Sequence, residues 1–328
     1  MKLTLWPALL GLTAALVAGC GRPPDSVTGG PSLDHPVKLR FQTDWYPQAE
    51  HGGFYQALAK GYYRGAGLDV EIIGGKPGFT APQSVLSGLS DLAMMRSDDL
   101  IAMVSRGLPL VIVGAYMEHD PQGVLVHGDS TVKTFADIKG HTLMAGPGQA
   151  WVEFIRRHYH IEFRMIPVAY GVAQFMADPD LVQQCFVTNE PYYVKMKGGT
   201  SRVLPLADSG YDPYRIIFTT KAYLREHPAA VKAFVDTSHR GWVDFMNGDP
   251  TPAMKLIIQR NQLMSEPFVR FSIAAMKQFH LVEGYPDRGE RSGLMTRERL
   301  GEQSQALADL KLIPAPLAVD RFAVNVDP

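Results

Sequence analysis

The chain has 328 residues, a formal net charge of −1 at pH 7 and two cysteines. A near-neutral charge without a basic cluster excludes nucleic-acid binding driven by attraction to phosphate. Cys20 ends an apolar N-terminal stretch, so only Cys185 remains for the folded part and an internal disulfide is excluded. The folded part is left with about 290 residues, which suits two lobes better than a single core.

The first residues predict an export signal. A basic start at Lys2 precedes the apolar run 3–17, and small residues follow at Ala18 and Gly19. This order is typical of a secretory signal peptide, and the run is too short for a permanent membrane-spanning helix. We therefore expect a signal peptide at 1–19.

Cys20 is a candidate for lipidation. The segment 17–20 resembles the bacterial lipobox, in which the cysteine receives lipid and becomes the first residue of the mature protein. The alternative is an ordinary signal peptide in which this cysteine has no function. Residues 20–36 are rich in Pro, Gly and Ser and predict a flexible tether. The resemblance implies an exported protein anchored by lipid to the cell membrane, facing the periplasm or the cell exterior.

Strands and helices alternate through the first part of the folded chain. Asp98 and Asp99 stand in the first turn of one predicted helix, where negative charge is favourable, and we expect both to be solvated. Strand–helix alternation with nearly continuous apolar strands favours a parallel sheet covered on both faces. The predicted strands are 37–42, 68–73, 91–95 and 110–115, and the predicted helices are 53–63, 82–89 and 97–106.

The pattern then restarts and predicts a second, smaller α/β lobe. After it, the segment 216–220 predicts a strand that returns to the first sheet, and the remaining chain is expected to be helical. The predicted strands of the second lobe are 122–126, 141–145, 163–168, 184–188 and 202–206, and its helical segments are 134–140, 149–159, 172–177 and 191–197. The final predicted helices are 221–247, 252–259 and 266–280.

These elements predict two lobes joined by a hinge. We expect lobe 1 at 37–121 and 215–328, and lobe 2 at 122–214. The chain would cross between them near 120–122 and again near 209–214. A binding cleft is expected between the lobes, because open α/β sheets bind ligands outside the carboxyl ends of their strands.

Several motifs resemble one known family. The run 44–55 matches the pattern D-W-x-P-x-x-x-H-x-G-x-Y, and K-G-Y-Y and G-L-D-V follow at 60–63 and 67–70. These motifs resemble the opening of the sulfonate- and pyrimidine-precursor-binding branch of the type II periplasmic binding proteins. Further matching segments are 86–93, 106–109, 137–140, 187–191 and 210–214.

The resemblance implies a fold and a function. The expected fold is α/β, the type II periplasmic-binding-protein fold, with two doubly wound α/β lobes joined by a two-crossover hinge. The expected function is capture of a small molecule by closure of the lobes, followed by delivery to the permease and ATPase of an ABC importer. We expect a monomer that is not an enzyme and carries no metal or cofactor.

Family members with this opening signature bind thiamine pyrimidine precursors of the hydroxymethylpyrimidine or formylaminopyrimidine type. Trp45 follows the first predicted strand, and its indole offers a platform for a flat ring. We expect Asp44, Asn189 and Glu190 to hydrogen-bond the amino edge of such a ring. Core packing of Trp45, and capping of a helix by Asn189 and Glu190 ahead of Pro191, are the structural alternatives.

Other aromatic and histidine side chains are weaker candidates. His51 stands at the family's histidine position and either contacts the ligand or holds its loop. Trp151 is expected to close over the ligand from the second lobe and form a sandwich with Trp45, with packing in its own helix as the alternative. The remaining candidates for ring or edge contacts, each with packing as the alternative, are Tyr116, Tyr192 and Tyr211.

The loop before the predicted helix 149–159 bears on the charge of the ligand. Relatives that bind sulfonate or phosphate place Ser or Thr there, but the segment 146–151 contains no hydroxyl. A neutral or cationic aromatic ligand therefore ranks above an alkanesulfonate. Riboflavin, which another relative in this branch binds, is a further alternative.

An enzyme is the alternative of a different class. The fungal pyrimidine synthase of thiamine biosynthesis shares the fold and the opening motif, and its family carries a lysine, a histidine and a cysteine-rich iron motif. Here Met95 and Asp99 stand at the lysine and histidine positions, and 211–215 contains no cysteine. A Schiff base needs an amine and iron needs ligands, so we disfavour this reaction. A binding protein that serves a separate sensor is the third class.

Overall fold

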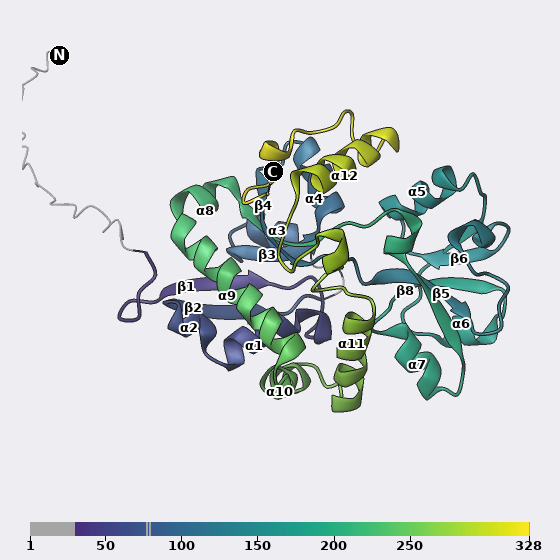
Figure 1. The fold of residues 1–328 in the computed structure, drawn as a ribbon, viewed down its shortest axis with the longest axis horizontal. Coiled ribbons are helices and arrows are strands. Elements are labelled where there is room, and N and C mark those ends of the chain that lie inside the picture. The colour runs from purple at the N-terminus through teal and green to yellow at the C-terminus, as the bar shows by residue number, and fades with distance from the viewer. Residues whose placement is uncertain (1–29, 77, 79, 328) are drawn as a thin grey trace, which may run out of the picture. The chain divides into compact units, whose positions relative to one another are not determined.

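The computed structural model describes residues 30–76, 78 and 80–327. From Pro31 onward the described chain forms one unit, which contains two five-stranded sheets (Figure 1). The predicted signal peptide and Cys20 lie outside the described residues. None of the helices in the described ranges is both long enough and apolar enough to span a bilayer.

The first sheet has the strand order β2-β1-β3-β10-β4. β1 pairs in parallel with β2 and β3, whereas β10 pairs antiparallel with both β3 and β4. The prediction of a wholly parallel sheet is therefore wrong, because the returning strand inserts between β3 and β4 and runs in the opposite direction. The bounds are β1 Val37–Gln42, β2 Leu68–Ile73, β3 Leu92–Arg96, β4 Leu110–Met117 and β10 Arg215–Thr220.

The two edges of this sheet are covered in different ways. β2 alternates buried Leu68, Val70 and Ile72 with residues that face solvent. All eight residues of β4 are buried: helices α4 and α9 pack against this strand, and the C-terminal tail pairs with its outer edge at Ile112. The Ile112 amide donates to the carbonyl of Phe322 over 2.8 Å, and the amide of residue 324 donates back to the Ile112 carbonyl over 3.1 Å. This tail removes an exposed apolar strand edge, which is otherwise a site of aggregation.

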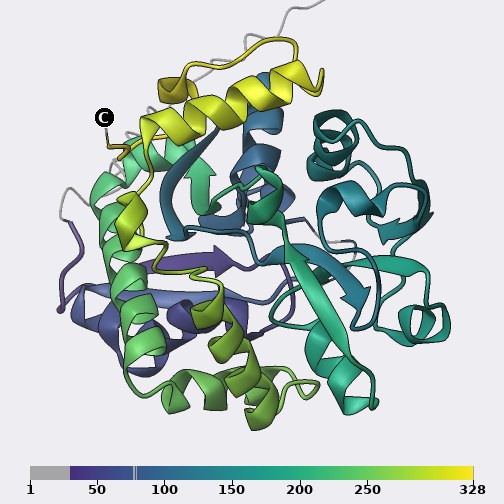
Figure 2. The ribbon, with the colours of Figure 1, turned by 45° about the vertical axis from the view of Figure 1, so that its right-hand side comes forward.

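Local chemistry corrects several predicted helices around the first sheet. The expected helix 221–247 is broken at His227, since a residue that precedes proline disfavours the helical region. The expected helix 53–63 ends early because Gly61 adopts a φ of 68°. α12, which packs against α4 (Figure 2), was not predicted. The helices are α1 Gly52–Ala59, α2 Tyr62–Gly65, α3 Ala81–Leu86, α4 Ser97–Ser105, α8 Lys221–Glu226, α9 Pro228–Asn247, α10 Thr251–Arg260, α11 Glu266–Gln278 and α12 Arg297–Asp309.

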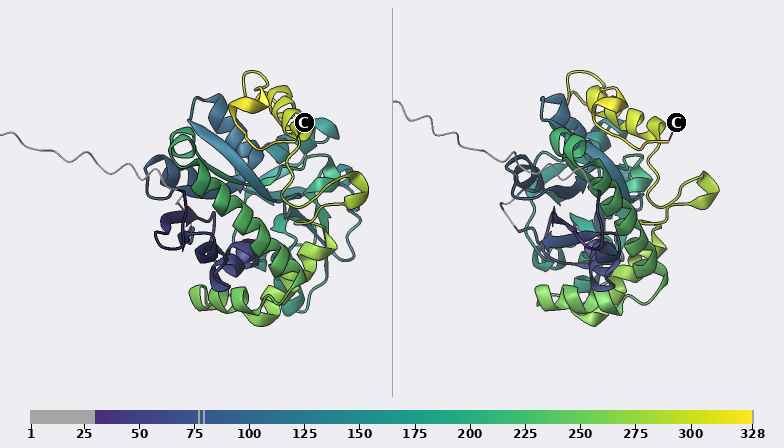
Figure 3. Two further views of the ribbon diagram at one scale, coloured as in Figure 1. Left: turned by 60° about the vertical axis from the view of Figure 1, so that its left-hand side comes forward. Right: turned by 90° about the vertical axis from the view of Figure 1, so that its left-hand side faces the viewer.

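Three glycines let α1 and α9 approach closely (Figure 3). Gly52 and Gly53 on α1 lie against the rings of Phe245 and Trp242, where added Cβ atoms would fall 2.1 Å from ring carbons. Gly241 on α9 lies against the α1 backbone, and a Cβ there would fall 2.2 Å from the Gly53 carbonyl oxygen. This contact holds the start of α1, and with it the preceding loop, against the longest helix.

The second sheet has the order β7-β6-β8-β5-β9. β6 is parallel to β7 and β8, and β5 is antiparallel to β8 and β9. Its strands are β5 Gln122–His127, β6 Thr142–Ala145, β7 Arg164–Pro167, β8 Leu181–Phe186 and β9 Ser201–Pro205. Its helices are α5 Ala150–His158, α6 Ala173–Ala177 and α7 Glu190–Met196, and the 3₁₀ turn Phe135–Ile138 precedes β6.

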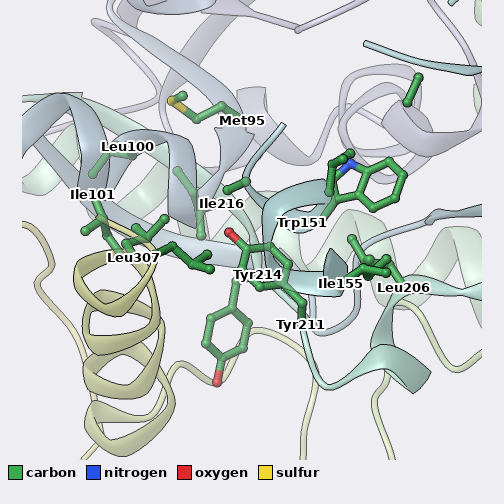
Figure 4. Close-up of a cluster of buried hydrophobic side chains, with 14 of the residues drawn as sticks. Met95, Leu100, Ile101, Trp151, Ile155, Leu206, Tyr211, Tyr214, Ile216 and Leu307 are labelled. Carbon is green, nitrogen blue, oxygen red and sulfur yellow. The ribbon is translucent and has the colours of Figure 1, made fainter. Parts of the chain in front are cut away.

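A buried apolar cluster connects the two sheets (Figure 4). It contains Ile216 of β10 and Leu307 of α12 together with Trp151 and Ile155 of α5. Tyr211, on the second crossover between the sheets, belongs to the same cluster and is 5% exposed. The apolar interior therefore continues through the crossover instead of stopping at it.

Candidate functional site

A cleft of about 410 Å³ is lined by residues from both parts of the chain. One wall is the loop that follows β1 together with the 3₁₀ turn η1, Ala49–His51. The loop between β7 and α6 and the start of α7 form the opposite wall, and the chain from the end of α10 into α11 completes the cleft. The cleft thus lies between the two sheets, where the sequence predicted a binding site.

Aromatic rings from opposite walls face each other in this cleft. The ring centroids of Trp45 and Tyr170 are 5.7 Å apart at an interplanar angle of 30°. Tyr170 is 77% exposed, so little protein packing fixes its ring besides this contact. Tyr46, Tyr193 and Phe268 add further aromatic surface. The two rings contact each other at this separation, and a ligand ring placed between them needs them about 7 Å apart, which is two van der Waals contacts. The exposed Tyr170 ring can move aside, after which a flat ligand ring has a stacking partner on each face.

The sequence pointed to Trp45 but missed Tyr170. One signal was available in the sequence. Tyr170 comes shortly after the predicted strand 163–168 of the second sheet, just as Trp45 comes shortly after a strand of the first sheet. The partner proposed for Trp45, Trp151, is fully buried in the apolar cluster and does not line the cleft (Figure 4). The predicted Trp45–Trp151 sandwich is therefore not formed, because Trp151 lies on the buried face of α5.

Two carboxyl groups line the cleft. Glu50 is 4% exposed and its Oε1 accepts a hydrogen bond from the Thr188 hydroxyl. Glu190 accepts from the amide of Phe186 over 2.8 Å. Burial raises the pKa of Glu50, and burial, with a contribution from Glu50, raises the pKa of Glu190 to about 7. None of the side chains in the cleft lining is Lys, Arg or His.

Asn189 adds a free acceptor to this acidic wall. Its Oδ1 atom is buried and has no hydrogen-bond partner in the described part of the chain. A buried polar atom without a partner costs free energy, which a ligand that donates a hydrogen bond recovers. Of the four polar residues that the sequence singled out around the ligand, Asn189 and Glu190 line the cleft.

The other two, Asp44 and His51, do not line the cleft. The Asp44 carboxylate contacts His51 Nε2 at 3.1 Å and accepts a hydrogen bond from Arg215. Burial alone would raise the pKa of Asp44, but the charge of Arg215 and the His51 contact outweigh it and hold the pKa at about 2. Tyr116 joins this cluster, since its hydroxyl accepts from Arg215 Nε over 3.1 Å. These residues fix the loop that carries Trp45.

Two of the predicted tyrosines are placed elsewhere. Tyr192 does not line the cleft but stacks on Phe268, a lining residue, with centroids 4.5 Å apart and planes inclined by 9°. Tyr211 is buried and donates to Asp98 Oδ2 over 2.6 Å. Tyr192 therefore supports the cleft wall, and Tyr211 belongs to the crossover.

A second buried cluster contains Asp98, which was expected to be solvated but is 1% exposed. Arg96 binds both of its carboxylate oxygens, at 3.0 and 2.6 Å. The same guanidinium donates to Gln122 over 2.7 Å and to Gln149 over 3.0 Å. Arg96 therefore ties the end of β3 to the start of β5 and to the residue that precedes α5. In the ranges the structure describes, no group of three or more acidic, His or Cys side chains is placed to hold a metal ion.

Comparison with known proteins identifies the family. A family model described as "NMT1/THI5 like" matches residues 48–253. The formylaminopyrimidine-binding protein of Halalkalibacterium halodurans is 24% identical over 244 residues, which cover 71% of this chain and 73% of the relative. The 4-amino-5-hydroxymethyl-2-methylpyrimidine phosphate synthase THI11 of Saccharomyces cerevisiae is 22% identical over 237 residues, 66% of this chain and 69% of the relative.

The fold is that of the periplasmic binding proteins. The crystal structure of the periplasmic aliphatic sulphonate binding protein SsuA from Escherichia coli superposes with a TM-score of 0.65. The match covers 89% of this chain and 93% of SsuA at 16% sequence identity. These matches confirm the resemblance and the fold class that the motifs implied. With its two linked α/β sheets and a family match over most of its length, the chain belongs to the NMT1/THI5-like family.

Proposed function

We propose that the protein is the solute-binding component of an ABC importer and captures a heteroaromatic amine, a thiamine pyrimidine precursor of the hydroxymethylpyrimidine or formylaminopyrimidine type. The observation that carries this proposal is the composition of the cleft. It offers aromatic faces from two sides, two carboxyl groups and a free amide oxygen, without a cationic side chain in its lining. An aminopyrimidine matches this surface, because it is flat and presents N–H donors.

The same composition argues against an anionic ligand. A sulfonate or phosphate group would meet Glu50 and Glu190 and no Lys, Arg or His. Placing a further negative charge beside these two carboxyl groups is costly, whether both are charged or one holds a proton. The ligand named for the formylaminopyrimidine-binding relative agrees with this preference.

The side chains that the chemistry of the fungal synthases would need are not found at the corresponding positions of this chain. Met95, at the position of the synthase lysine, is 8% exposed on β3 and offers no amine. Cys185, the cysteine within the described ranges, is buried, and burial raises the pKa of its thiol well above the ordinary value. We therefore favour binding without catalysis, although some of the relatives are synthases.

We further propose that lobe 1, at 37–121 and 215–328, and lobe 2, at 122–214, close on the ligand about the two crossovers. Two contacts across the cleft support this closure. The Trp45–Tyr170 stack and the Thr188–Glu50 hydrogen bond each join a residue of lobe 1 to a residue of lobe 2. A ligand that bridges these groups stabilises the closed state through contacts the open state lacks. The closed form would then dock on the permease.

Thermal-shift measurements test the ligand class. The probes are 4-amino-5-hydroxymethyl-2-methylpyrimidine, riboflavin and ethanesulfonate, each added to the purified folded chain. We expect the pyrimidine to raise the melting temperature, since a ligand that binds only the folded state stabilises it in proportion to RT ln(1 + [L]/Kd). Stabilisation by ethanesulfonate without stabilisation by the pyrimidine would contradict the proposal.

Trp45→Ala should weaken pyrimidine binding by about ten- to a hundredfold, because it removes a stacking face and its buried apolar area. Tyr170→Ala should weaken binding by about tenfold, since its ring is more exposed. Isothermal titration calorimetry measures both effects. Leu89→Ala, at an exposed position outside the cleft, is the control and should bind as the unmodified protein does. If Trp45→Ala and Tyr170→Ala bind the pyrimidine as tightly as Leu89→Ala does, the two rings do not contact the ligand.

Lipidation is tested at Cys20. Cys20→Ser should move the protein from the membrane pellet to the supernatant after ultracentrifugation, because the serine hydroxyl does not form the thioether that carries the lipid. Cys185→Ser is the matched control and should stay in the pellet, since its thiol is buried. Pelleting of the Cys20→Ser protein to the same extent would show that something other than this residue attaches the chain.

A further inference from the structure

The two carboxyl groups of the cleft are held in a common arrangement. Glu50 belongs to η1, and Glu190 is the first residue of α7. Thr188 connects the two sites, because it stands two residues before Glu190 and its hydroxyl donates to Glu50 Oε1. The Thr188 carbonyl in turn accepts from the Ser272 hydroxyl of α11 over 2.8 Å. Three separate segments thus place both acids on one cleft.

The surroundings of this acid pair contain little compensating positive charge. On the side of Glu50, His51 is engaged by Asp44, whose own charge adds to the repulsion. On the side of Glu190, the nearby titratable groups are Glu50, Cys185 and Tyr193. The remaining wall, from α10 into α11, contributes Asn261, Leu263, Met264, Phe268 and Ser272, none of which is charged.

Two ionised carboxylates are therefore unfavourable in the empty cleft. Desolvation raises the pKa of each group, and the charge of Glu50 raises the pKa of Glu190 further. The neutral donors present, the Thr188 hydroxyl and the Phe186 amide, each reach one carboxyl group and do not cancel a second charge. Two acids on one cleft without a cation in its lining are expected to carry one negative charge and one proton near neutral pH.

We propose that Glu50 and Glu190 together hold one proton in the empty cleft and that a ring nitrogen of the incoming heteroaromatic base takes up this proton. This inference rests on the proposed function, which supplies a flat base as the ligand. The O–H bond of one carboxyl group breaks and an N–H bond to the ring nitrogen forms. The pair gains one negative charge and the ligand one positive charge, so nothing is exchanged with the solvent.

This transfer gives the cleft a selectivity that shape alone does not provide. A base arrives neutral, which lowers its cost of desolvation, and is bound as a cation between two carboxylates. The free Asn189 Oδ1 accepts from an exocyclic amine at the same time. A ring of equal size without a basic nitrogen cannot take up the proton. It should bind at least tenfold more weakly.

The proton held by the pair is tested first in the protein without ligand. Carbon-13 NMR of glutamate-labelled protein should show a side-chain carboxyl that titrates at about pH 7 and is absent from Glu190→Gln. The amide oxygen of this variant still accepts from the Phe186 amide, so the local fold is retained. Two carboxyl groups at these positions that both titrate in the ordinary glutamate range would overturn the inference.

The pH dependence of stability gives a second reading of the same proton. The folded pKa of Glu190 lies above the unfolded value, so the folded state binds the extra proton between the two values. The stability that this proton contributes is complete below about pH 4.5 and is lost as the pH rises through about 7. The melting temperature of the unmodified protein should therefore fall relative to that of Glu190→Gln between pH 5 and pH 8, and parallel curves would contradict the inference.

Transfer to the ligand is tested by ultraviolet absorption with two probes. At a pH just above its own solution pKa, bound 4-amino-5-hydroxymethyl-2-methylpyrimidine should show the spectrum of the protonated ring, and Glu190→Gln should bind it as the neutral ring. The second probe, 4-aminobenzyl alcohol, lacks ring nitrogens and should bind at least tenfold more weakly. A neutral spectrum in the unmodified protein overturns the transfer and leaves the proposed function intact. If the pyrimidine does not bind, the proposed function fails, and the titration of the empty protein still decides on the proton.

Discussion

Arg215→Ala is expected to lower the free energy of unfolding by about 3–5 kcal/mol, the cost of removing one partner from a buried ionic cluster. Arg215 is 5% exposed on β10 and contacts Asp44, the Tyr116 hydroxyl and, at 3.7 Å, Asp120. Alanine would leave two largely buried aspartates without this charge and a cavity where the guanidinium lies. Urea denaturation of the purified folded protein at pH 7 measures the loss.

The acid side of the stability curve should change in the same variant. In the unmodified protein the pKa of Asp44 is lowered to about 2, so its carboxylate contributes stability that is complete above the ordinary value and is lost as the pH falls towards 2. Without Arg215, only the His51 contact opposes the effect of burial on Asp44, so this contribution should shrink. Arg225→Ala, at a position with a 74% exposed side chain, is the control and should cost less than about 0.5 kcal/mol. Equal costs at the two positions would show that the cluster is not a stabilising unit.

Gly241→Ala is expected to lower the free energy of unfolding by at least about 3 kcal/mol, at the upper end of the cost of overpacking. The new Cβ would fall 2.2 Å from the Gly53 carbonyl oxygen and 2.8 Å from the Cβ of Ala57. Neither atom is the end of a flexible side chain, so α1 and α9 would have to separate. Because α1 follows the loop that carries Trp45, pyrimidine affinity should fall together with stability.

Gly301→Ala supplies the matched control for this substitution. Gly301 also lies within a long helix, α12, but nothing stands within 4 Å of an added Cβ. Alanine should stabilise this helix by about 0.5–1 kcal/mol, since glycine is the poorer helix former. Thermal and chemical denaturation compare the two variants. Destabilisation of similar size at both positions would mean that close helix packing is not the cause.

The fold was predictable from the sequence as far as local pattern determines it. Apolar strand segments and the alternation with helices predicted two α/β sheets, and the proline at 228 offered a signal for the helix break that the prediction passed over. The insertion of β10 between β3 and β4 was not predictable in direction, because strand polarity depends on contacts more than a hundred residues apart. Helix α12 was missed although Thr296 caps it, since its apolar face is narrow.

In the candidate site, too, residues marked by local sequence were predicted, and residues that depend on distant contacts were not. Trp45, Asn189 and Glu190 were found because each follows a strand and carries suitable chemistry. Glu50 sits between residues of a recognised motif, but its burial depends on Thr188, which lies 138 positions away. A sequence pattern cannot distinguish a buried ring from a ring exposed in a cleft, which is why Trp151 was favoured and Tyr170 overlooked.

The position of β10 has a consequence for the order in which this chain becomes able to fold. Until Arg215 has emerged from the ribosome, β3 and β4 lack the strand that joins them, and each presents an unsatisfied backbone edge. A nascent chain that ends before this residue is expected to keep these edges open, and open strand edges favour association. Because β10 is the last strand of the first sheet along the chain, this sheet is completed only after roughly the first two-thirds of the polypeptide have been made.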